Sequence, residues 1–228
     1  MKRIKIYIAT MGLLVLPTTS VNSSSHKPAP SKHKPAHSSV TQKHPASETA
    51  DSWKPEAALM SNLAQEIQVS GYAFRLPDGY SEVAQPPEIV AQRQRGFNSH
   101  LYGSGRRSDG TASALGFTIA TPPPGITGTI SLDDALEGTL ARKKHQWQNF
   151  IESPIQDGQI NALAFKRVYF KGMVSGAAGT RMAHGFAYVA IDGKNIISFQ
   201  AEDAEPYNDQ SIPIAQAAVL TLHRLATQ

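Results

Sequence analysis

The chain has 228 residues, no cysteine and a formal net charge of +4. Residues 1–50 carry seven Lys/Arg against one acid, so the remainder, with 15 bases and 17 acids, has a net charge of −2. A nucleic-acid-binding domain needs a basic face, which this composition does not support, and the lack of cysteine excludes thiol catalysis and cysteine-ligated metal.

Residues 1–20 have the layout of a secretory signal peptide. Basic residues at Lys2, Arg3 and Lys5 precede an apolar run of 11 residues, and small polar residues follow it. Because a helix needs roughly 20 apolar residues to cross a bilayer, we expect the leader to be cleaved and the chain to be exported, periplasmic or secreted, with no stable membrane span. An uncleaved anchor is the alternative.

Residues 21–50 are rich in Pro, His, Lys and Ser and poor in apolar residues. Such a segment cannot bury enough surface to offset the entropy of folding, so we expect a disordered tether. Its histidines could bind a transition metal loosely, although the spacing fixes no ligand geometry and a solvated spacer is the simpler interpretation. They are His26, His33, His37 and His44.

Residues 51–228 read as one globular domain that opens with short elements. A helix over 55–67 is predicted from Leu59, Leu63 and Ile67, which lie four residues apart. Three strands follow, because the apolar runs are bounded by Pro and Gly turn signals. They cover 72–76, a run that starts at Tyr80, and 115–120.

The second half is predicted to hold the long helix and a meander. Ser131 reads as an N-cap followed by acids, and apolar residues continue on one face as far as Ile151. The strand over 163–173 changes its alternation near Lys166 and Arg167, which predicts a β-bulge. The remaining predictions are strands over 186–191 and 195–201, joined by a tight turn, and a closing helix from Ser211 to Leu225. The order of elements predicts an α+β domain with helices against an antiparallel sheet.

The run Phe74-Arg-Leu-Pro77-Asp-Gly79-Tyr80 resembles the opening of the PsbP-like superfamily. In that group a similar opening precedes strands, a helix, a meander and a closing helix, which matches the order expected from Tyr72 to Thr227. The resemblance implies an α/β/α sandwich. Many members are adaptor or assembly proteins, and the group offers no catalytic motif to carry over.

A search for chemistry finds no dinucleotide loop, phosphate loop, nucleophile elbow or zinc-protease motif. The domain has four histidines, and no two lie three or four residues apart as a helical metal pair would. We therefore predict no catalytic residues, no cofactor and no preformed metal site. The four histidines are His100, His145, His184 and His223.

Two weaker patterns leave alternatives open. His184 could face the acids Glu202 and Asp203 as a general acid–base pair of a hydrolase, or could be a strand-end histidine bonded to backbone. The run from Glu202 to Asp209 offers oxygen ligands for Ca²⁺ without EF-hand spacing, or is a solvated loop before a helix.

Two basic groups complete the candidate binding surface with His184. Arg106 and Arg107 lie in a polar, glycine-rich loop, which is either a binding loop or a plain hairpin loop. Lys143 and Lys144 on the long helix could meet an acidic partner, or form an ordinary charged outer face.

The sequence as a whole favours an exported, non-catalytic interaction or assembly module whose partner is an unidentified protein of the envelope. Binding of a small ligand or metal ion is the first alternative. A hydrolase that uses His184 with a nearby carboxylate is the second.

Overall fold

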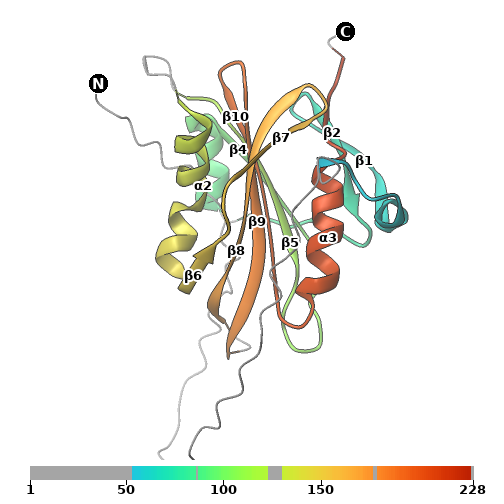
Figure 1. Cartoon of the computed structure of the whole chain (residues 1–228), viewed down its shortest axis with the longest axis vertical. Coiled ribbons are helices and arrows are strands. Elements are labelled where there is room, and N and C mark those ends of the chain that lie inside the picture. The colour runs from blue at the N-terminus through green and yellow to red at the C-terminus, as the bar shows by residue number, and fades with distance from the viewer. Residues whose placement is uncertain (1–52, 86, 123–129, 177–178, 227–228) are drawn as a thin grey trace, which may run out of the picture.

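The computed structural model describes residues 53–85, 87–122, 130–176 and 179–226, so the expected leader and tether both lie outside the described residues. The described residues form two antiparallel sheets and three α-helices (Figure 1). The expected α+β class is confirmed. The larger sheet has the order β3-β4-β5-β10-β9-β8-β6, with β7 also paired to β8, and the smaller has the order β1-β2-β11.

The strands of the larger sheet are β3 (Ser81–Glu82), β4 (Phe97–Gly103), β5 (Ala114–Ala120), β6 (Gln148–Glu152), β7 (Gln156–Ile160), β8 (Leu163–Gly176), β9 (Gly179–Asp192) and β10 (Asn195–Ala204). Those of the smaller sheet are β1 (Leu63–Val69), β2 (Tyr72–Pro77) and β11 (His223–Arg224). The helices are η2 (Ala57–Asn62), α1 (Pro87–Gln92), η3 (Arg93–Arg95), α2 (Leu132–Gln146) and α3 (Asn208–Val219).

The predicted helix over 55–67 is wrong beyond its first turns. A short 3₁₀ helix, η2, gives way to strand β1 at Leu63. Ser70 and Gly71 have φ of 49° and 86°, the backbone of a tight hairpin turn, so β1 folds back on the correctly predicted strand β2. The two-residue period of a strand also fits Leu63, Ile67 and Val69. An apolar run this short cannot distinguish a helix from a strand.

Helix α1 and strand β4 were not predicted. Strand β4 reads FNSHLYG, and its polar residues fall on both sides, which hides the alternation of a half-buried strand. Gly96 precedes it with φ of 85°, and a Cβ there would lie 2.3 Å from the carbonyl oxygen of Thr121. Glycine is therefore required where β4 begins, close to the end of β5.

Helix α2 is the predicted long helix, and the Ser131 hydroxyl caps it by accepting from the amide of Asp134. It ends at Gln146, whereas the sequence predicted it to continue to Ile151. Residues 148–152 instead form the edge strand β6, which pairs with β8. Asn149 has φ of 52°, a conformation that no α-helix contains.

The predicted bulge in 163–173 is also wrong, because β8 pairs with β9 in one unbroken register from Phe165 to Gly176. Both sides of β8 are covered, so apolar residues occur at both parities. The side chain that interrupts the pattern, Arg167, is fully buried. The turn between β9 and β10 at 192–195 is confirmed.

Helix α3 begins at Asn208, three residues before the predicted start, and ends at Val219. Leu222 and Leu225, which were predicted to continue it, follow the helix instead. His223 and Arg224 form β11 and add an edge to the smaller sheet.

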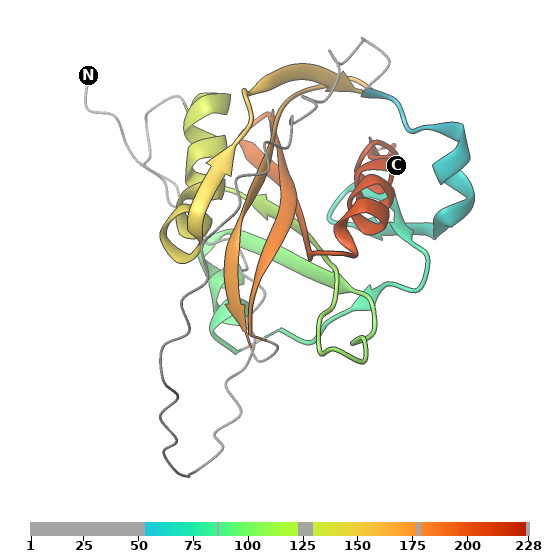
Figure 2. The ribbon, with the colours of Figure 1, turned by 60° about the horizontal axis from the view of Figure 1, so that its bottom comes forward.

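The larger sheet separates two clusters of buried side chains, and α2 and α3 lie on opposite sides of it (Figure 2). On the α3 face, α3 and the smaller sheet enclose an aromatic core in which the Phe117 and Phe199 ring centroids lie 4.6 Å apart. On the α2 face, α2 packs on β8 and β9 through Leu136 and Leu140. This arrangement is an α/β/α sandwich.

Candidate functional site

Strands β8 and β9 form a long hairpin, with 14 residues in each strand. Strand β10 pairs with β9 only as far as Ala204, which lies opposite Ala183. Strand β6 pairs with β8 only as far as Gln148, opposite Met173. The end of the hairpin therefore extends beyond both neighbouring strands (Figure 1).

One side of this hairpin end forms a surface that we call the hairpin face. Opposed residues of antiparallel strands point to the same side, so the register places Ile151, Lys171 and His184 in one row and Met173 and Met182 in the next. Ile151 is 56% exposed, and both methionines are half-buried and outside the two described cores. The hairpin face therefore combines one exposed and two half-buried apolar side chains with ionisable ones.

His184 contacts a different carboxylate from those predicted. Its Nε2 lies 2.8 Å from Oε1 of Glu205, and both side chains are partly exposed. Asp203 is its neighbour in register on β10, but Glu202 points to the other face of the sheet. The hydrogen bonds described for His184 and Glu205 include no serine or threonine hydroxyl that could serve as a nucleophile.

Asp203 lies in the same row of the hairpin face as His184, and Arg107 covers it. The Arg107 guanidinium donates to both carboxylate oxygens at 2.8 and 2.6 Å, and Ser211 donates its hydroxyl at 2.6 Å. The same guanidinium lies 4.1 Å from the ring centroid of Tyr207. The Asp203 bonds raise the pKa of Arg107. Arg107 thus fixes its loop against the start of α3.

The same loop is tied to the hairpin through Asp109, which accepts from Arg181 at 2.6 Å. Asp109 also accepts from the backbone amide and the hydroxyl of Thr111 at 3.0 and 2.7 Å. These bonds lower the pKa of Asp109 to about 2, the amide of Thr111 contributing most. Arg106 stays exposed on this loop.

The acidic run from Glu202 to Asp209 does not converge on one point. Glu202 pairs with Lys143, Asp203 with Arg107 and Glu205 with His184, on different sides of β10. Within the described ranges, no three His, Asp or Glu side chains are grouped as metal ligands. The histidines of segment 21–50 lie outside those ranges.

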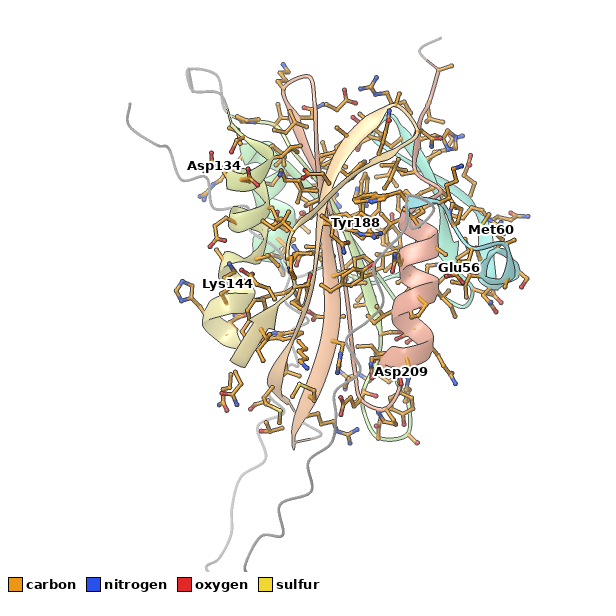
Figure 3. The ribbon with its side chains drawn as sticks, viewed as in Figure 1. Glu56, Met60, Asp134, Lys144, Tyr188 and Asp209 are labelled. Atoms are coloured by element: carbon orange, nitrogen blue, oxygen red, sulfur yellow. The ribbon has the colours of Figure 1, made fainter. Side chains whose placement is uncertain are left out.

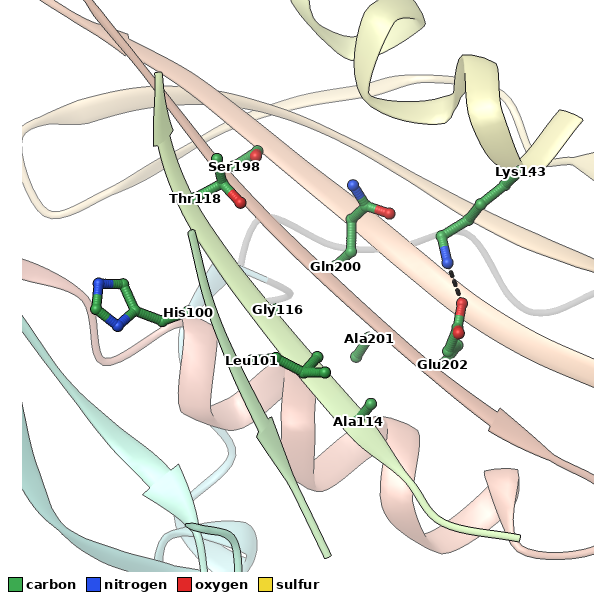
Figure 4. A pocket seen from close by; sticks show the side chains of 10 residues that line it. All are labelled: His100, Leu101, Ala114, Gly116, Thr118, Lys143, Ser198, Gln200, Ala201 and Glu202. Atoms are coloured by element: carbon green, nitrogen blue, oxygen red, sulfur yellow. Dashed lines mark hydrogen bonds and ion pairs between the residues drawn. The ribbon is translucent and has the colours of Figure 1, made fainter. Parts of the chain in front are cut away.

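A small hollow lies on the α2 face, over β4, β5 and β10 (Figure 4). Lys143 reaches into it from α2 and forms an ion pair with Glu202, while its ammonium lies 5.2 Å from the ring centroid of Trp147. The Gln200 amide nitrogen faces the carbonyl of Thr139 at 3.4 Å, so its oxygen is buried without a described partner. The volume is about 20 Å³, on the order of one water molecule.

The predicted surface residues therefore fall into two groups. Arg106, Arg107 and His184 lie at the hairpin end of the molecule. Lys143 is buried on the α2 face, and Lys144 forms ion pairs with Glu137 and Glu152 at 2.7 and 3.0 Å.

A buried cation on the α3 face was missed by the sequence analysis. Arg167 donates to the amide oxygen of Gln156 at 2.6 Å and to the hydroxyl of Tyr188 at 3.0 Å, and its guanidinium carbon lies 4.3 Å from the ring centroid of Trp53. Tyr188 lies between the sheet and α3 (Figure 3), and burial raises its pKa. The only sequence signal was a basic residue inside an apolar strand.

None of the described helices has both the length and the apolar character that crossing a membrane requires. No protein-family model matches this chain, and no curated protein matches it.

Solved structures similar to this chain include a cyanobacterial PsbP from Synechocystis, at 16% identity and a TM-score of 0.49 over 73% of this chain and 94% of the other. LpqN, involved in cell envelope biogenesis of Mycobacterium tuberculosis, is 10% identical with a TM-score of 0.44, over 68% and 83%. The Ran-binding protein Mog1p of Saccharomyces cerevisiae is 10% identical with a TM-score of 0.43, over 70% and 94%. PsbP and Mog1 structures are thus among those similar to this chain, as the opening motif predicted, and the likeness concerns the fold alone.

Proposed function

We propose that this chain is an exported, non-catalytic protein-interaction module that binds its partner through the hairpin face. The observation that carries the proposal is the placement of Ile151, on the edge strand β6, beside Met173 and Met182 near the end of the β8–β9 hairpin, with all three outside both described cores. Apolar side chains with a polar rim are typical of protein interfaces, and methionine adapts to irregular partner surfaces. Lys171, His184 and Glu205 supply the rim.

Both alternatives have less support. Ligand pockets commonly enclose about 300–1,000 Å³, far more than the hollow beside Lys143 and Glu202. A hydrolase needs a nucleophile or an activated water beside its base, and the described bonds of His184 lead only to Glu205.

Export rests on the signal-like composition of residues 1–20, which is followed by the Pro/His/Lys/Ser-rich segment 21–50. On this proposal the partner is a protein of the cell envelope or of the space outside it. The net charge of −2 after residue 50 does not favour nucleic acid.

The test is affinity capture from envelope extract on the immobilised full chain, with crosslinking and mass spectrometry. The double variant Met173→Asp/Met182→Asp places two charges on the hairpin face. The control, Val83→Asp/Val90→Asp, changes two valines that are 39% and 44% exposed, one directly after β3 and the other in α1.

A partner retained by the wild type and the control, but lost with the methionine variant, supports the proposal. Equal retention by all three proteins, or equal loss from both variants, contradicts it. Circular dichroism and the melting temperature of each variant confirm that it is folded before capture.

A further inference from the structure

The charges around the hairpin face are unequally compensated. Two nearby acids have a described guanidinium partner, Asp203 held by Arg107 and Asp109 by Arg181, while Glu205 lies within hydrogen-bond distance of His184. Two cations, Lys171 and Arg106, have no ion pair among the described residues. Lys171 and Arg106 therefore carry positive charge that no described ion pair neutralises.

Of these two cations, Lys171 is the one that lies among the apolar side chains of the hairpin face. It lies directly opposite Ile151 on β6 and His184 on β9, and it is half-buried. Met173 and Met182 form the next row. A cation set among apolar side chains is partly shielded from water, so an opposite charge brought to it interacts more strongly than at an open surface.

Resting on the function proposed above, we infer that the hairpin face recognises an acidic, apolar peptide segment in its protein partner. A carboxylate of that segment pairs with Lys171, and the neighbouring apolar side chains cover Ile151, Met173 and Met182. Arg106, on the adjoining loop, adds attraction at the rim. Charge complementarity thus selects the partner, while the apolar contacts supply most of the affinity.

An anionic lipid surface is a poorer fit to the same charge. Electrostatic recognition of anionic membranes commonly uses clusters of about four to eight Lys/Arg. Two uncompensated cations, Lys171 and Arg106, fall short of that number. A carboxylate on a peptide needs only one well-placed cation.

The test selects binders from a random peptide display library on the immobilised full chain. It compares the wild type with Lys171→Glu, Met173→Asp and the control Lys194→Glu. Lys194 lies in the exposed turn at the other end of β9, so the control makes the same charge change away from the hairpin face. Recovered peptides are remade with each acid replaced by its amide, and affinity is measured by fluorescence polarisation.

We expect wild type and Lys194→Glu to enrich peptides with Asp or Glu beside apolar residues. Lys171→Glu should bind those peptides at least about tenfold more weakly and enrich Lys- or Arg-containing ones instead. Wild type and Lys171→Glu should bind the amide forms of these peptides with equal affinity.

A failure of this inference and a failure of the proposed function give different results. If Met173→Asp abolishes binding but the peptides show no acid preference, or Lys171→Glu binds them unchanged, the inference fails and the proposed function stands. If Met173→Asp binds as the wild type does, the proposed function itself fails. Binding of phosphatidylserine vesicles that is lost in Lys171→Glu, with no peptide enriched, also overturns the inference.

Discussion

Trp53 and Gly158 are in such close contact that a Cβ atom added to the glycine would lie 1.9 Å from Cε2 of the indole ring. The ring covers the guanidinium of Arg167 and meets Tyr188 edge-on, with centroids 5.5 Å apart. The glycine on β7 thus makes room for an aromatic side chain from the first described residue of the domain.

Gly158→Ala should therefore displace the Trp53 indole and destabilise the domain by about 1–3 kcal/mol. The displaced indole should emit at longer wavelength, measured in a Trp147→Phe background because the chain has two tryptophans. Gly116→Ala is the matched control, since its Cβ would meet nothing nearer than 3.8 Å. An unchanged Trp53 emission in Gly158→Ala would contradict the contact.

Arg107→Met should be strongly destabilising, whereas Arg106→Met should be nearly neutral. The first change leaves the buried Asp203 carboxylate without its two guanidinium bonds, at a cost of about 3 kcal/mol. The second removes an exposed side chain from the same loop. Urea unfolding checks both, and equal stabilities of the two variants would show that the ion pair contributes nothing.

Low pH should loosen the loop that Asp109 ties to the hairpin. Because the pKa of Asp109 is lowered to about 2 in the folded chain, its stabilising contribution is present above the ordinary pKa and is lost as pH falls from about 4 towards 2. The midpoint is measured from the Asp109 carboxyl carbon by NMR.

Thr111→Val should raise that pKa, because the hydroxyl of Thr111 donates one of the hydrogen bonds that lower it. The valine variant keeps the backbone amide donor, so the pKa should stay below its ordinary value. A midpoint that does not move in Thr111→Val would refute the assignment of the hydroxyl bond.

The Lys143–Glu202 pair should behave as a buried ion pair. Lys143→Met alone removes a cation that pairs with a carboxylate only 13% exposed, which should cost about 3 kcal/mol, whereas Lys143→Met/Glu202→Met should return close to wild-type stability. Lys144→Met, which removes partly exposed ion pairs, should cost less than about 1 kcal/mol. If the effects of Lys143→Met and Glu202→Met on the free energy of unfolding simply add in a double-mutant cycle, the two side chains do not interact as proposed.

Where one side of an element faces a core and the other faces water, the sequence predicted the element well. Helix α2, capped by Ser131, was found in this way, whereas the turn between β9 and β10 was found from its turn residues, Asp192 to Lys194. Strand β8 was predicted with a false bulge, because both of its sides are buried and Arg167 breaks the apolar pattern. The end of α2 was missed because the left-handed backbone of Asn149 leaves no periodic signal.

The candidate surface was harder to predict, because it depends on the register between neighbouring strands, which the alternation within each strand does not reveal. His184 was identified, but its partner Glu205 lies beyond the end of β10, where alternation no longer indicates direction. Met173 ended a predicted strand, Met182 lay outside the predicted strands, and neither was singled out. Only their pairing on a hairpin that projects beyond β6 and β10 leaves them outside a core.

The position of Trp53 also has a mechanical consequence. A pull on the N-terminal segment is resisted first by the side-chain contact of Trp53 with Gly158 and Arg167, and next by η2 and β1, which precede the larger sheet in the chain. Along β8, six residues separate Arg167 from Met173, which is about 20 Å of strand. Tension would therefore release the indole and load the smaller sheet before it reached the β8–β9 pairs that shape the hairpin face.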